Sequence, residues 1–160
     1  MNNKQTTIKK SVSLEGVGIH TGKDVKLTFH PAKENSGYVF RRVDLDDKPE
    51  IEALAKYVIN TQRGTTLEKD GVKLKTTEHV LAALVGLEID NIVIEINAEE
   101  PPIMDGSSKF FVEALEKAGV EELISFRNEY IVKDVISFND YESGSEITLI
   151  PSDSYQITTM

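Results

Sequence analysis

A carboxylate and an imidazole stand side by side at Glu78 and His79, in the run Thr-Thr-Glu-His-Val-Leu-Ala-Ala-Leu (76–84). Glutamate can accept a proton from water and histidine can ligate a metal ion, so the pair could divide two tasks of a zinc hydrolase. A complete site of that kind needs three protein ligands close together. With only three histidines in the whole chain and no cysteine, the sequence offers too few obvious ligands for it. The pair also fits a glutamate that stabilises a helix start beside a histidine that packs or faces solvent. We interpret it as half of an active site.

The second candidate is His20, in the glycine-rich run Gly-Val-Gly-Ile-His-Thr-Gly-Lys (16–23). The glycine spacing suggests a phosphate-binding loop, but a dinucleotide fingerprint opens a helix, and here a strand pattern follows. A tight connection between two strands is therefore the favoured interpretation. Histidine is an unusual residue to fill so tight a loop, which keeps His20 as a candidate for substrate binding or for a place near the active site.

Two weaker signals follow. Asp105 precedes an apolar-periodic segment in the run Pro-Pro-Ile-Met-Asp-Gly-Ser (101–107), where Asp and Ser usually cap a helix, so a structural role is favoured over catalysis. Four basic residues could contact an anion, although nothing in their spacing separates them from solvated surface charges: Lys23, Arg41, Arg42 and Arg63.

Strands must hold most of these candidates. Val25, Leu27 and Phe29 alternate with polar residues, as in a half-buried strand. Asp70 and Gly71 suit the turn of a hairpin. Segment 53–59 fits either a strand or a helical turn. Further strand patterns are expected at 8–14, at 38–43 as a strand returning after a turn, and at 91–97.

Two helices are expected. The first starts at Thr77 as N-cap, carries Glu78 in its first turn, and ends at Gly86. The second starts at 105–108 and ends at Gly119. The order of strands, helix, strand and helix predicts an α+β fold, a two-layer sheet/helix domain over residues 1–123.

The character of the chain changes after residue 123. Residues 124–129 are interpreted as a linker and 130–160 as the truncated start of a second domain. Strands are expected at 130–138 and 146–150 with a turn at 140–145, and 155–160 is expected to be a strand that stops mid-element. Three uncovered strands cannot easily bury a face of their own.

Composition limits the function. At 160 residues, with 39% hydrophobic and 28% charged residues, the chain should form a packed core. A formal net charge of −9 argues against nucleic-acid binding. No apolar run suits a signal peptide or a transmembrane helix, so a cytoplasmic protein with at most peripheral membrane contact is expected.

Five motifs in order and at this spacing resemble the N-terminal half of UDP-3-O-acyl-N-acetylglucosamine deacetylase, the zinc enzyme of the committed step of lipid A synthesis in Gram-negative bacteria. The resemblance covers residues from about 7 to the end. The motifs are Gly-Val-Gly-Ile-His-Thr-Gly-Lys (16–23), Tyr-Val-Phe-Arg-Arg-Val-Asp-Leu (38–45), Thr-Thr-Glu-His-Val-Leu-Ala-Ala-Leu (76–84), Ile-Asp-Asn-Ile-Val-Ile-Glu-Ile-Asn (89–97) and Pro-Ile-Met-Asp-Gly-Ser (102–107).

The resemblance implies two similar α+β domains that sandwich their helices between outer sheets, with zinc at the cleft between them. It implies that Glu78 is the general base, that His79 is one zinc ligand, and that His20 lies near the active site. The implied substrate is a UDP-linked, 3-O-acylated N-acetylglucosamine. Asp105 matches a family position interpreted as mainly structural.

The departures from the family pattern concern the missing part. The other two zinc ligands and the acid histidine of the family lie in its second domain, and no histidine follows His79 here. Segment 61–66 is more polar than is common in the family. The polypeptide alone is therefore expected to be inactive without the missing C-terminal domain. The alternatives are a non-catalytic module that binds a nucleotide-sugar or a partner, and a purely structural fragment.

Overall fold

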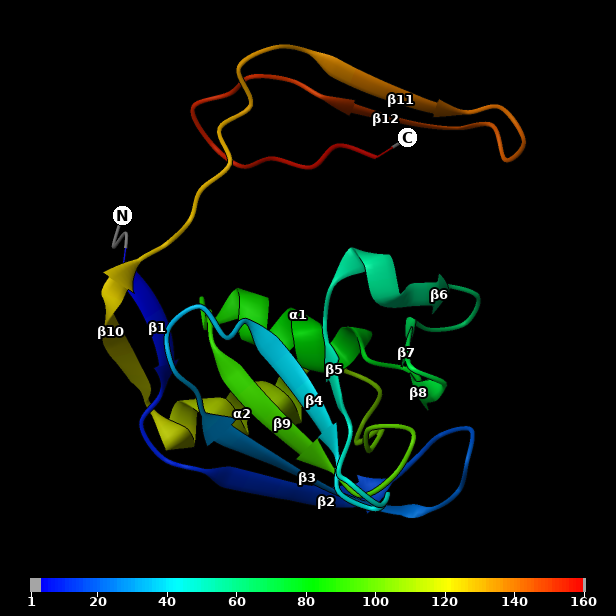
Figure 1. Ribbon diagram of the computed structural model, residues 1–160, viewed down its shortest axis with the longest axis vertical. Helices are drawn as coiled ribbons and strands as arrows, with labels where there is room; N and C mark the ends of the chain where they lie inside the picture. Colours follow the sequence, from blue (N-terminus) through cyan, green and yellow to red (C-terminus); the bar gives the residue numbers. More distant parts are fainter. Residues whose placement is uncertain (1–3, 160) are drawn as a thin grey trace. The chain divides into compact units, whose positions relative to one another are not determined.

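The computed structural model describes residues 4–159, which divide into two compact units, one ending at Phe126 and the other beginning at Arg127 (Figure 1). Helices and strands both occur in the first unit, so the predicted α+β class is confirmed. Its elements are β1 (Lys4–Ile8), β2 (Val12–Val17), β3 (Asp24–Pro31), β4 (Tyr38–Arg42), β5 (Glu50–Glu52), the 3₁₀ turn η1 (Ala55–Tyr57), β6 (Val58–Asn60), β7 (Thr66–Lys69), β8 (Val72–Leu74), α1 (Glu78–Gly86), β9 (Ile92–Ile96), α2 (Lys109–Ala118) and β10 (Val120–Phe126).

A five-stranded sheet with the order β2-β3-β9-β4-β5 forms the base of this unit. The strand predicted to return at 38–43 is present as β4, but it does not pair with β3. Strand β9 lies between them, antiparallel to β3 and parallel to β4. Ile92, Ile94 and Ile96 are completely buried, which explains why this apolar strand takes the central place.

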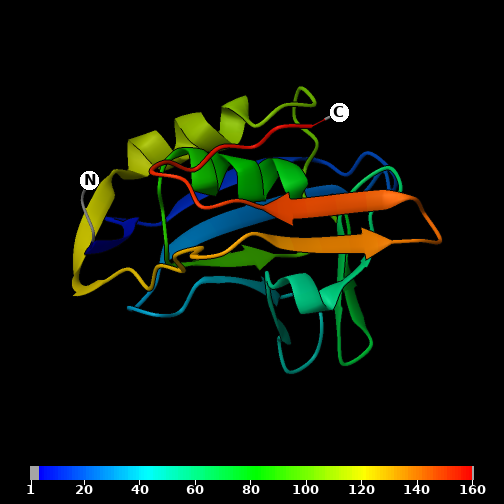
Figure 2. The ribbon, with the colours of Figure 1, turned by 90° about the horizontal axis from the view of Figure 1, so that it is seen from above.

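Helices α1 and α2 cover one face of the sheet (Figure 2). The inward residues of β3 alternate with exposed ones, as the period-2 pattern predicted. Phe29 of β3 meets Phe111 of α2 edge to face, with ring centroids 6.5 Å apart and planes at 89°. In the described part of the chain, neither helix is long and apolar enough to cross a membrane.

A smaller three-stranded sheet, β6-β7-β8, carries the predicted hairpin. Asp70 and Gly71 have φ of 51° and 79°, the left-handed pair that a tight two-residue turn requires. Segment 53–59 takes both of the forms considered for it, since η1 is a helical turn and β6 begins directly after it.

The sequence pattern indicated neither β5 nor β10, and the strand expected at 8–14 is interrupted at residues 9–11, between β1 and β2. Strand β10 follows Gly119, whose φ of +74° ends α2 as predicted, and pairs antiparallel with β1. Val120, Glu121 and Glu122 carry no alternating apolar signal because β10 belongs to a two-stranded ribbon with mostly exposed side chains. The strand reaches Phe126, inside the segment interpreted as a linker.

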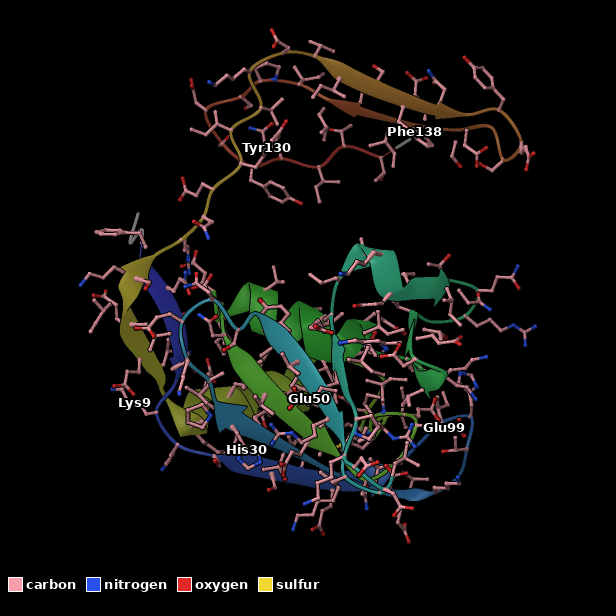
Figure 3. All side chains as sticks on the ribbon, in the orientation of Figure 1. Lys9, His30, Glu50, Glu99, Tyr130 and Phe138 are labelled. Atoms are coloured by element: carbon pink, nitrogen blue, oxygen red, sulfur yellow. The ribbon has the colours of Figure 1, made fainter. Side chains whose placement is uncertain are left out.

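The second unit is a hairpin of β11 (Ile136–Asp140) and β12 (Ser145–Leu149). The strand expected at 130–138 begins only at Ile136, because the ladder extends no further than its five paired residues. The strand expected at 155–160 is wrong for the described residues 155–159, which have no strand structure; Met160 lies outside the described residues. Within this unit Tyr130 and Phe138 are exposed (Figure 3).

Candidate functional site

The two candidate catalytic residues open helix α1. Glu78 is its first residue, and Glu78 Oε1 lies 3.9 Å from His79 Nε2. Both side chains are about one third exposed, so solvent or a ligand can reach them. Thr77 occupies the N-cap position, but its side chain makes no capping bond to the helix. The backbone N–H groups at this end favour a negative charge, which is the structural role considered for Glu78.

The loop between β6 and β7 holds the Glu78 carboxylate in place. The backbone N–H of Thr65 donates to Glu78 Oε2 at 2.7 Å, while Oε1 is the oxygen nearer to His79. Thr77 donates to the Thr65 carbonyl through both its N–H and its hydroxyl, each at 3.2 Å. The hydroxyl of Thr77 therefore ties the loop to the helix start instead of capping the helix.

His20 lies in the connection between β2 and β3, as the favoured interpretation required. Its side chain is half exposed. The turn is closed by Gly18 N–H donating to Lys23 O at 3.0 Å and Gly22 N–H donating to Gly18 O at 2.9 Å. The loop is thus a compact backbone structure that leaves one face of the imidazole open to solvent, while His20 Nε2 lies 4.0 Å from Glu100 Oε1.

Glu100 is the residue of this region that sequence reasoning missed. Its side chain is completely buried, and its carboxylate accepts the backbone N–H groups of His20 and Thr21 and the hydroxyl of Thr76. Burial raises the pKa of Glu100, but these hydrogen bonds outweigh burial and leave the pKa below its ordinary value. The carboxylate is therefore ionised at neutral pH and joins the His20 loop to the segment that leads into α1.

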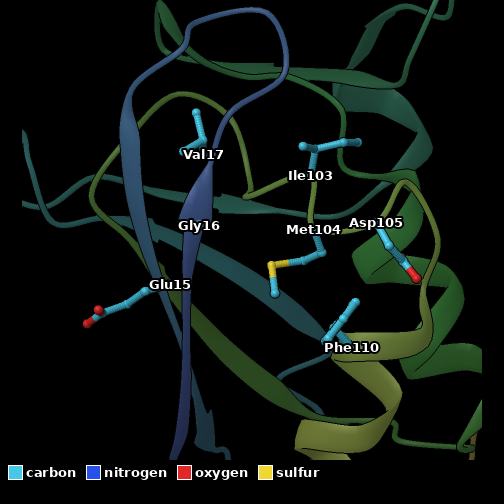
Figure 4. Close-up of a pocket in the computed structure, with 7 residues that line it drawn as sticks. All are labelled: Glu15, Gly16, Val17, Ile103, Met104, Asp105 and Phe110. Atoms are coloured by element: carbon cyan, nitrogen blue, oxygen red, sulfur yellow. The ribbon is translucent and has the colours of Figure 1, made fainter.

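Asp105 does not cap α2. The helix begins at Lys109, and Asp105 Oδ1 accepts the hydroxyl and N–H of Ser107, at 2.7 and 3.0 Å. The Ser107 hydroxyl chiefly lowers the pKa of Asp105, with a smaller opposing effect of desolvation. Asp105 also borders an open, mainly apolar hollow of about 390 Å³, whose wall includes Met104 and Phe110 (Figure 4).

Two of the basic residues considered as anion contacts already have carboxylate partners. Arg41 pairs with Glu50 at 2.6 Å and Glu95 at 3.0 Å, which raises its pKa. Arg42 is nearly buried, with two hydrogen bonds of 2.8 Å to Asp44. These pairs explain both arginines as structural residues. Lys23 and Arg63 stay predictions.

Comparison with known proteins decides the family. The family model described as UDP-3-O-acyl N-acetylglycosamine deacetylase matches residues 5–160. The chain belongs to this family. The resemblance inferred from the five motifs is thereby confirmed.

Relatives in this deacetylase family cover nearly the whole chain. The chain is 45% identical to the bifunctional enzyme LpxC/FabZ of Bacteroides thetaiotaomicron, over 98% of the chain and 34% of that protein. It is 43% identical to the UDP-3-O-acyl-N-acetylglucosamine deacetylase of Idiomarina loihiensis, over 96% of the chain and 50% of that protein. The chain thus spans between one third and one half of the length of these relatives.

The donor set of this deacetylase-family chain fits part of a zinc site. The His79 imidazole is accessible and stands beside a carboxylate that could serve the attacking water. Among residues 4–159, no three His, Cys, Asp or Glu side chains are grouped so that they could hold a metal ion. A catalytic zinc site uses three protein ligands, so His79 could supply one of them.

Proposed function

We propose that this chain supplies the general base and one zinc ligand for hydrolysis of the N-acetyl group of UDP-3-O-(3-hydroxyacyl)-N-acetylglucosamine, the committed step of lipid A synthesis. The base is Glu78 and the ligand is His79. His20 lies near the substrate. Family membership and the names of the relatives support deacetylation of a UDP-3-O-acyl-N-acetylglucosamine, and the roles of the three residues follow the resemblance of their motifs.

The observation that carries the proposal is that the two oxygens of the Glu78 carboxylate have different neighbours. The Thr65 N–H orients it through Oε2, while Oε1 lies 3.9 Å from the His79 ring. A general base must be held in place and still reach the proton that it takes. A glutamate that only stabilised the helix start would need neither the loop contact nor the adjacent imidazole.

The chemistry follows from these positions. Zinc, when bound, would polarise the acetamide carbonyl and lower the pKa of the attacking water. Glu78 accepts one proton from that water as its oxygen bonds to the carbonyl carbon. The nitrogen then takes a proton from a general acid, which the resemblance places in the second domain, and the C–N bond breaks. The acetic acid that forms loses its proton, which leaves acetate and the free glucosamine amine.

We further propose that the 160-residue polypeptide alone does not catalyse this reaction. Its described residues contribute one histidine to a site that takes three ligands. The longest natural polypeptide that contains this sequence is expected to be active, since the relatives are two to three times longer than the matched region. Zinc-dependent turnover by the pure 160-residue chain would contradict this proposal.

The test is Glu78→Gln in that longest natural polypeptide. The amide oxygen of glutamine can still accept the Thr65 N–H, so the loop contact is kept while the base is lost. We expect kcat/KM to fall by about 10²–10⁴. The free energy of unfolding should change by no more than about 1 kcal/mol, because only the charge at the helix start is removed.

The matched control is Glu116→Gln, on the exposed side of α2. It makes the same chemical change and should leave both kcat/KM and stability unaltered. If Glu78→Gln keeps more than about one tenth of the parent activity, Glu78 is not the base. Unaltered activity would favour the non-catalytic binding module.

A further inference from the structure

A completely buried carboxylate joins the two halves of the candidate site. Glu100 Oε2 accepts the N–H groups of His20 and Thr21, at 3.0 and 3.1 Å, and Oε1 accepts the Thr76 hydroxyl at 2.9 Å. The His20 and Thr76 sites are 80 and 24 positions away from it in sequence. A buried charge is costly unless donors surround it, so these bonds are a condition of the fold here.

The neighbouring glutamate shows what an ordinary surface residue does at this place. Glu99 is one third exposed and pairs with Lys75 at 3.3 Å. Its backbone carbonyl also accepts the Lys75 N–H at 2.8 Å. Because of this bond, segment 99–100 lies beside segment 75–76. Glu100 therefore turns inward from the same short segment in which Glu99 turns outward.

The His20 loop is built tightly around Glu100. A Cβ added at Gly18 would lie 2.8 Å from Glu100 Oε2 and would overlap the Thr21 hydroxyl, so only glycine fits there. The backbone of Val17, at the start of the loop, accepts the Ile103 N–H at 2.9 Å. The loop is thus bound to segment 100–103 by two contacts, the hydrogen bonds to the charged Glu100 carboxylate and the backbone bond from Ile103 to Val17.

The other end of the link leads directly to the proposed catalytic pair. Thr76 has a left-handed φ of 53°, which is strained for a β-branched residue and is held by its bond to Glu100. It stands two residues before Glu78. Its bond to Glu100 therefore connects the His20 loop to the entry of α1.

We propose that Glu100 is a positioning residue, whose carboxylate sets the place of His20 relative to Glu78 and His79. It does so by fixing the His20 loop to the segment that enters α1. The link itself concerns the fold, whereas its catalytic consequence rests on the proposed function. A carboxylate suits this task because each oxygen only accepts, so all three donors can converge on one group.

Amide hydrogen exchange on the 160-residue chain tests the link without any activity. In Glu100→Ala, the His20 and Thr21 amides should exchange about 10–10² times faster, the factor for losing a hydrogen bond to a charged group. Glu100→Gln keeps an acceptor for these amides and can donate to the Thr76 hydroxyl, so it should fold and recover part of the protection. Glu99→Ala is the matched control and should leave both amides unchanged. Protection that persists in Glu100→Ala would overturn the proposal.

A double-mutant cycle in the longest natural polypeptide tests the catalytic consequence. Glu100→Ala alone should lower kcat/KM by about 10², the effect of a small misplacement of a catalytic group. Combined with His20→Ala it should add less than about a twofold further loss, because His20 is then no longer there to be positioned. Two independent, multiplying losses would mean that Glu100 only stabilises the fold, and would overturn the proposal.

The two experiments separate this proposal from the proposed function. If the parent polypeptide has no deacetylase activity, the proposed function fails, and the positioning role in that reaction fails with it. The exchange rates of the His20 and Thr21 amides still decide whether Glu100 holds the loop. If the parent is active and the exchange rates do not respond to Glu100→Ala, only the positioning role fails.

Discussion

Gly18→Ala adds a single methyl group, and we expect it to lower the free energy of unfolding of the first unit. The added Cβ would lie 2.8 Å from Glu100 Oε2, closer than such atoms pack, and would overlap the Thr21 hydroxyl. The Thr21 hydroxyl can rotate away from the new methyl group, whereas the completely buried Glu100 side chain cannot rotate away. Its carboxylate must shift by a few tenths of an ångström, which lengthens the bonds from His20 and Thr21.

The magnitude follows from these contacts. Inserting one carbon into a packed region costs about 1–3 kcal/mol, and strained hydrogen bonds to a charge fall in the same range, so about 2 kcal/mol is expected. Urea unfolding followed by circular dichroism would show this as a midpoint lower by about 1 M. The matched control is Gly86→Ala, where a Cβ meets nothing within 4 Å at the end of α1. Alanine is the better helix former, so the control should gain up to about 1 kcal/mol.

The same substitution should therefore change stability in opposite directions at Gly18 and Gly86. A loss of less than about 0.5 kcal/mol for Gly18→Ala would mean that the loop is not pinned to Glu100. A second check combines Gly18→Ala with Glu100→Ala. If steric conflict with the carboxylate is the cause, the double variant should lose less stability than the sum of the losses in the two single variants.

Two further predictions concern charge and metal. Asp44 has a pKa below its ordinary value of 3.8, chiefly because of its hydrogen bonds to Arg42, so this stabilisation is present above about pH 4 and is lost as pH falls through the folded pKa. Asp44→Asn should cost about 1–2 kcal/mol at pH 7 and flatten acid unfolding, whereas the exposed control Asp46→Asn should do neither. Zinc titration of the 160-residue chain by calorimetry should show no binding, or weak binding that His79→Ala abolishes, because one ligand holds zinc poorly. Tight stoichiometric binding that depends on His79 would contradict the half-site interpretation.

Some of the site was predictable because its signals are local. Glu78 and His79 are adjacent in sequence, and a helix start places them together whatever the rest of the chain does. The loop that carries His20 was predictable from its glycines, between two strand patterns. The roles of Asp105 and Thr77 were not, because both types can cap a helix or bond to a nearby loop, and only the packed chain selects between these.

The sequence by itself determined the kind of each strong element and the family. Period-2 alternation identified β3 and β9, the Asp70–Gly71 turn identified a hairpin, and Gly119 marked the end of α2, because these depend on neighbours a few residues away. Tertiary structure alone decided that β9 separates β3 from β4 and that Glu100 is buried while Glu99 is partly exposed. The sequence does not distinguish two adjacent glutamates. Glu100 can be buried only because the fold brings hydrogen-bond donors to it from positions 24 and 80 residues away.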